Sequence, residues 1–313
     1  MSSFRKAKIV SLGLNLPMQK NLLLKTSTNP LYVLVLFWLN FSQMANSQNI
    51  VTMLSRKQVE NKNILEMLYK DSAYVQKKRL VNTLFAHTSP GQWGEFVKGV
   101  DEELVTQKKI IAFTFDACGN KSNKYNNELI DYLRKEKIPA TLFVSGAWID
   151  DNYNTFLELS RDTLFEIENH GLNHQPCSVN GESEYGIKGT PNVPDAFDEI
   201  EANERKIELL TGRRPLFYRS ATAFTDEACA RIAKLLNVTI VSFDILSGDA
   251  MPFAPAQSIV NNVIKNAKPG AIVIMHFNHP EWFACDAMMG IIPSFRKKGY
   301  TFTRLKDYPL KSR

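Results

Sequence analysis

Short apolar stretches recur from residue 109 onward and alternate with longer amphipathic segments. Near-continuous runs of β-branched and aromatic residues predict strands that are buried on both faces. The expected strands are Ile110–Phe115, Ala140–Val144, Leu164–Ile167, Leu216–Tyr218, Val238–Phe243, Ala271–Met275 and Tyr300–Phe302. Apolar residues at helical spacing predict the intervening helices, at Asn127–Glu136, Asp195–Leu210, Asp226–Leu236, Ala256–Asn266 and Ala284–Lys297.

Strands that alternate with helices pair in parallel and carry the helices on the outside. About seven such units favour a distorted (β/α) barrel over an open sheet, although the periodicity alone is compatible with both. We therefore predict an α/β fold with a distorted barrel at residues 105–313. Residues 48–104 are more polar, contain a helical pattern at Lys57–Arg79 and a break at Pro90-Gly91, and predict an N-terminal helical extension.

Residues 1–47 have the three parts of an export signal. Lys20 and Lys25 precede the apolar run Leu31–Leu39, and Ala45-Asn46-Ser47 offers small residues for cleavage. The run is shorter than the roughly 20 residues that span a bilayer. The pattern predicts a signal peptide, export to the periplasm or the medium, and no stable membrane insertion after cleavage. A membrane anchor, or a true start at Met18, is the alternative.

The formal charge of +6 belongs almost entirely to this leader. The leader contains five basic residues and no acidic one, so the rest of the chain has 33 basic and 32 acidic residues. A nearly neutral domain gives no support for a nucleic-acid partner.

Polar, reactive side chains follow directly after the expected strands. They are Asp116, His170, Arg219, Asp244, Asp249 and His276. In a parallel α/β barrel the carboxyl ends of all strands open on one face, so these side chains should converge.

The segment from His170 to His174 places two imidazoles four residues apart, and a helical turn would put both on one face to hold a metal ion. Surface or capping histidines are the plainer interpretation. Of the five histidines in the chain, four lie in two short strand-end loops, which favours the metal: His170, His174, His276 and His279. Asp116 at a strand end predicts a base or ligand, or else a turn cap. Arg219 predicts a partner for that carboxylate, or else a surface ion pair.

Five segments, in order, resemble the motifs of the polysaccharide deacetylase family (NodB-homology domain, carbohydrate esterase family four). They are Thr114-Phe115-Asp116, His170-x-x-x-His174, Phe217-Tyr218-Arg219-Ser220, Ser247-Gly248-Asp249 and Ile274-Met275-His276. The resemblance covers about residues 105–308. It implies a distorted barrel, a divalent metal that is usually zinc, and hydrolysis of N- or O-acetyl groups on glycans.

The resemblance also implies roles for individual residues. Asp116 matches the catalytic base, Arg219 the arginine that positions it, and Asp249 the acid of the fourth motif. His276 matches the histidine that protonates the leaving group, and Ile274 the apolar residue beside the acetyl methyl.

His170 and His174 match the two metal-binding histidines, and Ala117 stands where the family has an aspartate ligand. A methyl group cannot bind a metal, so another donor must complete the set. Asp116 is our first candidate, and the others are Asn120, Asp249 and His279.

Other departures concern the substrate groove. Arg219-Ser220-Ala221-Thr222 lacks the usual proline and aromatic residue, Ala250 replaces an aromatic residue, and the loop Gln175–Asn192 is long. These changes should reshape the groove.

The four cysteines, Cys118, Cys177, Cys229 and Cys285, fit no C-x-x-C motif. Cys118 could pair with Cys177 in an exported protein, or all four could be free buried thiols.

The sequence as a whole predicts an exported metal-dependent hydrolase that removes acetyl groups from a polysaccharide or peptidoglycan. One alternative is an amidase or cyclic-imide hydrolase on the same scaffold. The other is an inactive glycan-binding module, which Ala117 favours and the retained histidines oppose.

Overall fold

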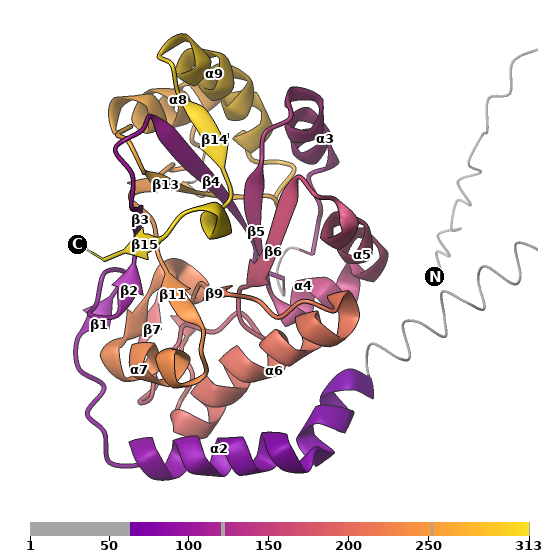
Figure 1. Cartoon of the computed structure of the whole chain (residues 1–313), viewed down its shortest axis with the longest axis vertical. Helices are drawn as coiled ribbons and strands as arrows, with labels where there is room; N and C mark the ends of the chain where they lie inside the picture. Colours follow the sequence, from indigo (N-terminus) through magenta and orange to yellow (C-terminus); the bar gives the residue numbers. More distant parts are fainter. Residues whose placement is uncertain (1–62, 120–122, 252, 313) are drawn as a thin grey trace, which may run out of the picture. The chain divides into compact units, whose positions relative to one another are not determined.

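The computed structural model describes residues 63–119, 123–251 and 253–312. The leader at residues 1–47 and the first part of the predicted extension therefore lie outside the described residues. Within the described part, a curled sheet is surrounded by helices (Figure 1).

Nine strands of the described ranges form the main sheet, and every pairing between them is parallel. The order is β12 (Ile245–Leu246), β13 (Ile272–His276), β4 (Ile110–Ala117), β5 (Ala140–Val144), β6 (Phe165–Asn169), β9 (Phe217–Tyr218), β11 (Thr239–Val241) and β2 (Val100–Asp101). The ninth strand, β14 (Thr301–Thr303), pairs with the first residues of β4. The predicted distorted (β/α) barrel is confirmed as a curled half-barrel. All seven expected strands are present, and β2 and β12 are additional.

Five helices occupy the segments in which the sequence predicted them. They are α3 (Asn127–Glu136), α6 (Val193–Thr211), α7 (Glu227–Leu235), α8 (Ala256–Lys265) and α9 (Ala284–Lys297). Two shorter helices, α4 (Gly146–Asp151) and α5 (Tyr153–Arg161), connect β5 to β6. Side-chain caps fix several helix starts; Asn126, for example, accepts a hydrogen bond from the Leu129 N–H at 3.0 Å.

The remaining strands and short helices form small pairs and turns at the edges. They are β1 (Trp93–Gly94) with β10 (Thr225–Asp226), β3 (Glu103–Leu104) with β15 (Leu310–Lys311), β7 (Ser183–Glu184) with β8 (Ile187–Lys188), and the 3₁₀ turns η1 (Ala221–Ala223) and η2 (Leu305–Asp307). The long loop after His174 carries the β7–β8 hairpin.

The alternation of side chains along β4 separates the apolar core from the chemistry. Ile111, Phe113, Phe115 and Ala117 belong to the largest apolar cluster, together with residues of α3 and α9. Thr114 and Asp116 lie on the other face of the strand, where both contact Arg219. Because successive strand residues point to opposite faces, the side chain at 117 is directed away from Asp116.

The N-terminal extension is helical but is not one continuous helix. Residues 63–70 are helical, and α2 (Ser72–Phe85) starts anew after Asp71, whose side chain accepts a hydrogen bond from the Tyr74 N–H. The predicted helix Lys57–Arg79 is therefore interrupted, because Asp71 caps a new helix start. Helix α2 packs on α6, and the Tyr74 hydroxyl donates to Asp198 at 2.6 Å. Within the described ranges, no helix is long and apolar enough to cross a membrane.

The carboxyl group of Glu204, on the buried side of α6, should make stability depend on pH. It accepts a hydrogen bond from Asn169 at 2.9 Å, and burial raises the pKa of Glu204 to about 8. The folded chain thus holds a proton that the unfolded chain loses near pH 4.5, and stability falls as the pH rises through this window. Between about pH 5 and 8, the unfolding free energy of the natural chain should fall by about 1–3 kcal/mol more than that of Glu204→Gln.

Urea unfolding at both pH values measures this difference, with the exposed Glu208→Gln on the same helix as the matched control. Identical pH dependence in the natural chain and Glu204→Gln would contradict the assignment.

Candidate active site

The carboxyl ends of the central strands bring most of the predicted residues together. Asp116 is the penultimate residue of β4 and His276 the last of β13, and the two are register neighbours. His170 follows β6 and Arg219 follows β9. Asp244 does not join them, because its carboxylate pairs with Lys268 at 2.9 Å.

Arg219 and Asp116 form a buried ion pair. The Arg219 side chain is fully buried, and its Nη1 lies 2.8 Å from Asp116 Oδ1 and 2.8 Å from Thr114 Oγ1. Its Nε and Nη2 donate to the carbonyl oxygens of Val241 and Ser242. These contacts exclude the alternative of a surface ion pair for Arg219. They fix one oxygen of Asp116, and the other, Oδ2, lies 3.7 Å from His170 Nε2.

The ring of His170 is held in one orientation. Its Nδ1 is 2.8 Å from the carbonyl oxygen of Arg219, which can only accept, so Nδ1 carries the proton. The lone pair of the neutral ring is then on Nε2, which faces Cys118 Sγ at 3.8 Å. Burial lowers the pKa of His170, but the facing Asp116 and Cys118 more than offset it and raise the pKa overall.

His174 approaches His170 through a loop rather than the expected helical turn. Residues 170–175 are not helical, and His174 adopts a left-handed backbone conformation with φ of 56°. The buried Glu199 of α6 holds this loop, because its carboxylate accepts the N–H groups of Asn173 and Gln175. Gly171 is required here, since a Cβ would lie 2.2 Å from a Glu199 oxygen. The strained left-handed conformation of His174 is therefore held in place by the contacts of Glu199 with its neighbours, as is common for strained residues at functional sites.

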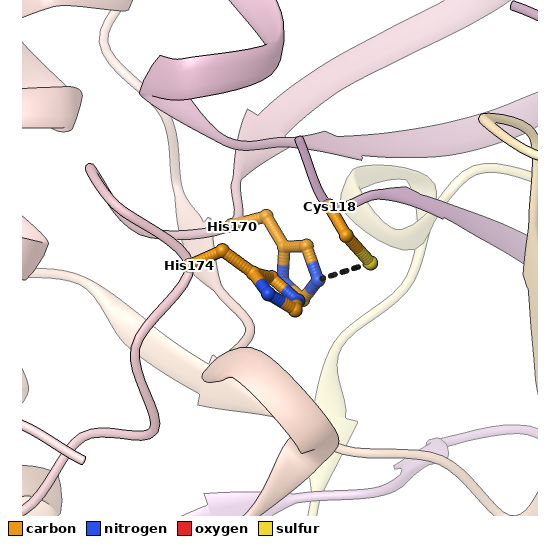
Figure 2. Close-up of side chains that lie close together, drawn as sticks. All are labelled: Cys118, His170 and His174. Atoms are coloured by element: carbon orange, nitrogen blue, oxygen red, sulfur yellow. Dashed lines mark hydrogen bonds between the residues drawn. The ribbon is translucent and has the colours of Figure 1, made fainter. Parts of the chain in front are cut away.

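Figure 2 shows Cys118, His170 and His174 side by side. One donor atom from each lies within 4.8 Å of the other two, so the three could hold a metal ion together. Cys118 was not among the metal-binding residues predicted from the sequence. The available signal was the period-two alternation of β4, which turns Ala117 toward the core and brings the next residue back to the strand-end face.

The other proposed donors are engaged elsewhere or not described. Asp249 binds His276, while His279 lies 2.9 Å from Glu281 and stacks on Trp282 at 3.6 Å. Asn120 lies outside the described residues. Asp116 borders the Cys118–His170–His174 cluster through the 3.7 Å contact with His170, and its role as a ligand stays a prediction.

His276 and Asp249 form a second charged pair. Asp249 accepts the backbone N–H of His276 at 2.7 Å, and its oxygens lie 3.2 and 3.3 Å from Nδ1 of the ring. Burial lowers the pKa of His276, but Asp249 outweighs it and raises the pKa well above the usual value, so the imidazolium is favoured. The ring also interacts with Cys118, which links this pair to the two other histidines.

A small apolar cluster separate from the main core includes Ile274, the residue two positions before His276 on β13. Ile274 packs with Ala223 and Phe243 in a small separate cluster. Thr222 and Ala223, in the altered third motif, both have positive φ values, 62° and 60°. All four cysteines of the chain are described and are free thiols. Cys177 interacts with Cys229, and the disulfide considered between Cys118 and Cys177 is absent because both thiols are free.

A curled parallel sheet with charged side chains and a possible metal-binding cluster at its strand ends places the chain in the class of α/β half-barrel proteins. Residues 104–241 match the family model described as polysaccharide deacetylase. A peptidoglycan-N-acetylglucosamine deacetylase of Bacillus cereus is 27% identical over 208 residues, which cover 66% of this chain and 90% of that protein. The chain belongs to the polysaccharide deacetylase family (CE4, NodB-like).

Solved structures share the fold. A family 4 acetyl xylan esterase from Clostridium thermocellum, in complex with a cobalt ion, has a TM-score of 0.52 at 22% identity, covering 64% of this chain and 89% of that one. A CE4 pseudoenzyme from Bacillus anthracis has a TM-score of 0.54 at 20% identity, covering 64% of this chain and 65% of that one. The family thus includes metal-binding members as well as pseudoenzymes.

Removing one partner of the buried ion pair should be costly. Arg219→Met leaves Asp116 charged without its partner, and we expect unfolding free energy to fall by about 3–5 kcal/mol. In Asp116→Asn/Arg219→Met the unpaired charge is gone, so part of the loss should be recovered. Denaturant unfolding of the two single variants, the double variant and the natural chain measures the coupling. Strictly additive losses would show that the two side chains do not act as a pair.

Proposed function

We propose that this protein is an exported, metal-dependent hydrolase that removes acetyl groups from N-acetylated, or O-acetylated, sugars of a polysaccharide or peptidoglycan. The main support is a single arrangement. Asp116, which is paired with Arg219, and His276, which is paired with Asp249, lie at the ends of the adjacent strands β4 and β13, next to a cluster suited to a metal.

The residues present fit a divalent ion. The Nε2 atom of His174 is buried and has no hydrogen-bond partner among the described residues, and Nε2 of His170 presents a lone pair to the same cluster. Unpartnered buried nitrogen atoms are costly unless a ligand completes them. His170 and His174 would hold the metal, and zinc is the proposed ion. When bound, such an ion polarises the acetyl carbonyl and lowers the pKa of water.

The protein's own side chains then divide the proton transfers. Asp116 keeps one oxygen on Arg219, which leaves Oδ2 to accept a proton from the attacking water. His276, protonated because of Asp249, donates to the departing amine nitrogen. Its side chain is 17% exposed, so a substrate can approach it. Ile274, Ala223 and Phe243 offer an apolar surface for the acetyl methyl.

Acetate release tests the proposal. The full chain, loaded with zinc, should release acetate from N-acetylglucosamine oligomers or peptidoglycan fragments, with O-acetylated xylan as the second substrate class. Asp116→Asn and His276→Gln should each lower kcat by about 10²–10⁴-fold, the usual contribution of a general base or acid. Asp244→Asn, at a strand end outside the cluster, should keep the activity.

The outcomes also separate the alternatives. Cleavage of small amides or cyclic imides without acetate release would favour the amidase. Glycan binding without turnover of any substrate would favour the inactive module, a possibility raised by the fold of the CE4 pseudoenzyme.

Export rests on the leader at residues 1–47, with its basic stretch, apolar run and small residues. Fusing residues 1–50 to a reporter that folds only outside the cytoplasm should yield an active, processed reporter. Replacing Leu34 and Leu36 with Arg should abolish it, because a charged residue disrupts the apolar run. An unprocessed but membrane-bound reporter would indicate an anchor instead.

A further inference from the structure

We infer that Cys118 is a metal ligand, so that the site is a thiolate–bis-imidazole centre selective for thiophilic ions such as Zn²⁺, Co²⁺ and Cd²⁺. The inference deepens the proposed function only in assigning the ligands and the class of metal. It depends on the cluster of three side chains and not on the substrate.

The first support is geometric. Around zinc, a sulfur at about 2.3 Å and a nitrogen at about 2.0 Å in tetrahedral positions are roughly 3.5 Å apart. Cys118 Sγ and His170 Nε2 are separated by 3.8 Å, and His174 contributes a third donor within 4.8 Å of both. An ion can therefore enter between the three atoms with only small side-chain movements.

The second support is that each donor is aimed inward by a neighbour. The carbonyl oxygen of Arg219 takes the Nδ1 proton of His170 and leaves Nε2 free. Glu199 holds the loop of His174, whose buried Nε2 lacks a hydrogen-bond partner within the described residues. Hydrogen bonds of this kind to metal-binding histidines fix the ring orientation and the protonated nitrogen.

The third support is the placement of residue 117. Ala117 packs in the largest apolar cluster with Phe113 and Phe115, so a carboxylate at this position would enter the core. Cys118 is half-buried at the strand end, beside His170. The donor that the family motif places at 117 is therefore supplied by the next residue.

A set of one thiolate and two imidazoles has chemical consequences. Thiolates favour soft or borderline ions over Mg²⁺, Ca²⁺ and Mn²⁺, which prefer oxygen donors. Three protein ligands also leave the fourth tetrahedral position open, as catalytic zinc sites require. Asp116 Oδ2, at 3.7 Å from His170 Nε2, borders the cluster without having to act as a ligand.

Cobalt spectroscopy on the metal-free full chain tests the assignment without any substrate. Co²⁺ should produce a thiolate-to-cobalt charge-transfer band in the near ultraviolet. Cys118→Ser and Cys118→Asp should abolish this band, whereas Cys285→Ala, which removes a thiol from α9, should keep it. Circular dichroism confirms that each variant is folded.

Metal affinities provide the second readout. Cys118→Ser should weaken Zn²⁺ binding by at least about 100-fold. Loss of a residue that only hydrogen-bonds to a metal ligand already lowers metal affinity by up to about 100-fold, and loss of a ligand should cost more. Cys118→Asp should bind Zn²⁺ better than the serine variant, and its ratio of Cd²⁺ to Mn²⁺ affinity should fall, because oxygen replaces sulfur. If Cys118→Ser itself unfolds, the aspartate variant still tests the assignment.

The inference is overturned if the natural chain binds Co²⁺ without the band, or if Cys118→Ser keeps the natural affinity for Zn²⁺. Failure of the proposed function gives a different result. A cobalt band that depends on Cys118, together with no release of acetate from any glycan, would refute deacetylation and leave the ligand assignment standing.

Discussion

The buried pair of Arg219 and Asp116 is the interaction on which the rest of the site depends. A guanidinium without exposure to water is tolerated only when its donors are satisfied, and here Asp116, Thr114 and two backbone carbonyls take them. These partners come from β4 and from β11 and the residue after it, so one side chain ties three strand ends together across the curled sheet. Its own carbonyl then orients His170. The contacts of Arg219 therefore stabilise the fold and also orient Asp116, the candidate base, and His170, the candidate ligand. Loss of Arg219 would disturb all of these contacts.

The sequence predicted the elements well because their signals are local. The seven strand segments and five helices depend on apolar spacing, which a parallel half-barrel with two-sided burial makes unusually clear. The interruption at Asp71 and the two-residue strands β2 and β12 were not predicted. In the first case, the side chain of Asp71 caps a new helix start, although the apolar spacing continues across this position. In the second, pairing with a longer neighbour creates strands too short to have a pattern of their own.

The sequence predicted most of the residues of the candidate site, but it predicted their arrangement in space less well. Motif order and strand-end placement identified Asp116, His170, Arg219, Asp249 and His276, which the sheet gathers. The loop of His174 was misjudged because its shape depends on Glu199, a residue of α6 that is far away in sequence. Cys118 was missed because matching motifs position by position ignores which face of the strand each residue occupies. Only the alternation along β4 shows that Ala117 belongs to the core.

The exchange of a carboxylate for a thiolate need not change the electrostatics of the reaction. Both ligands carry one negative charge, so a divalent ion with two neutral imidazoles would keep the same net charge in either set. What would change is the preference for the ion, whereas Asp116 would keep the role of the base. With Cys118 as the third ligand, the second oxygen of Asp116 stays free for proton transfer, while Arg219 holds the first. The His276–Asp249 pair on the adjacent strand can then serve as the acid without competing for the metal. A thiolate ligand at 118 would therefore keep metal binding and acid–base chemistry on separate side chains, and the absence of an aspartate at 117 is weak evidence that the chain is inactive.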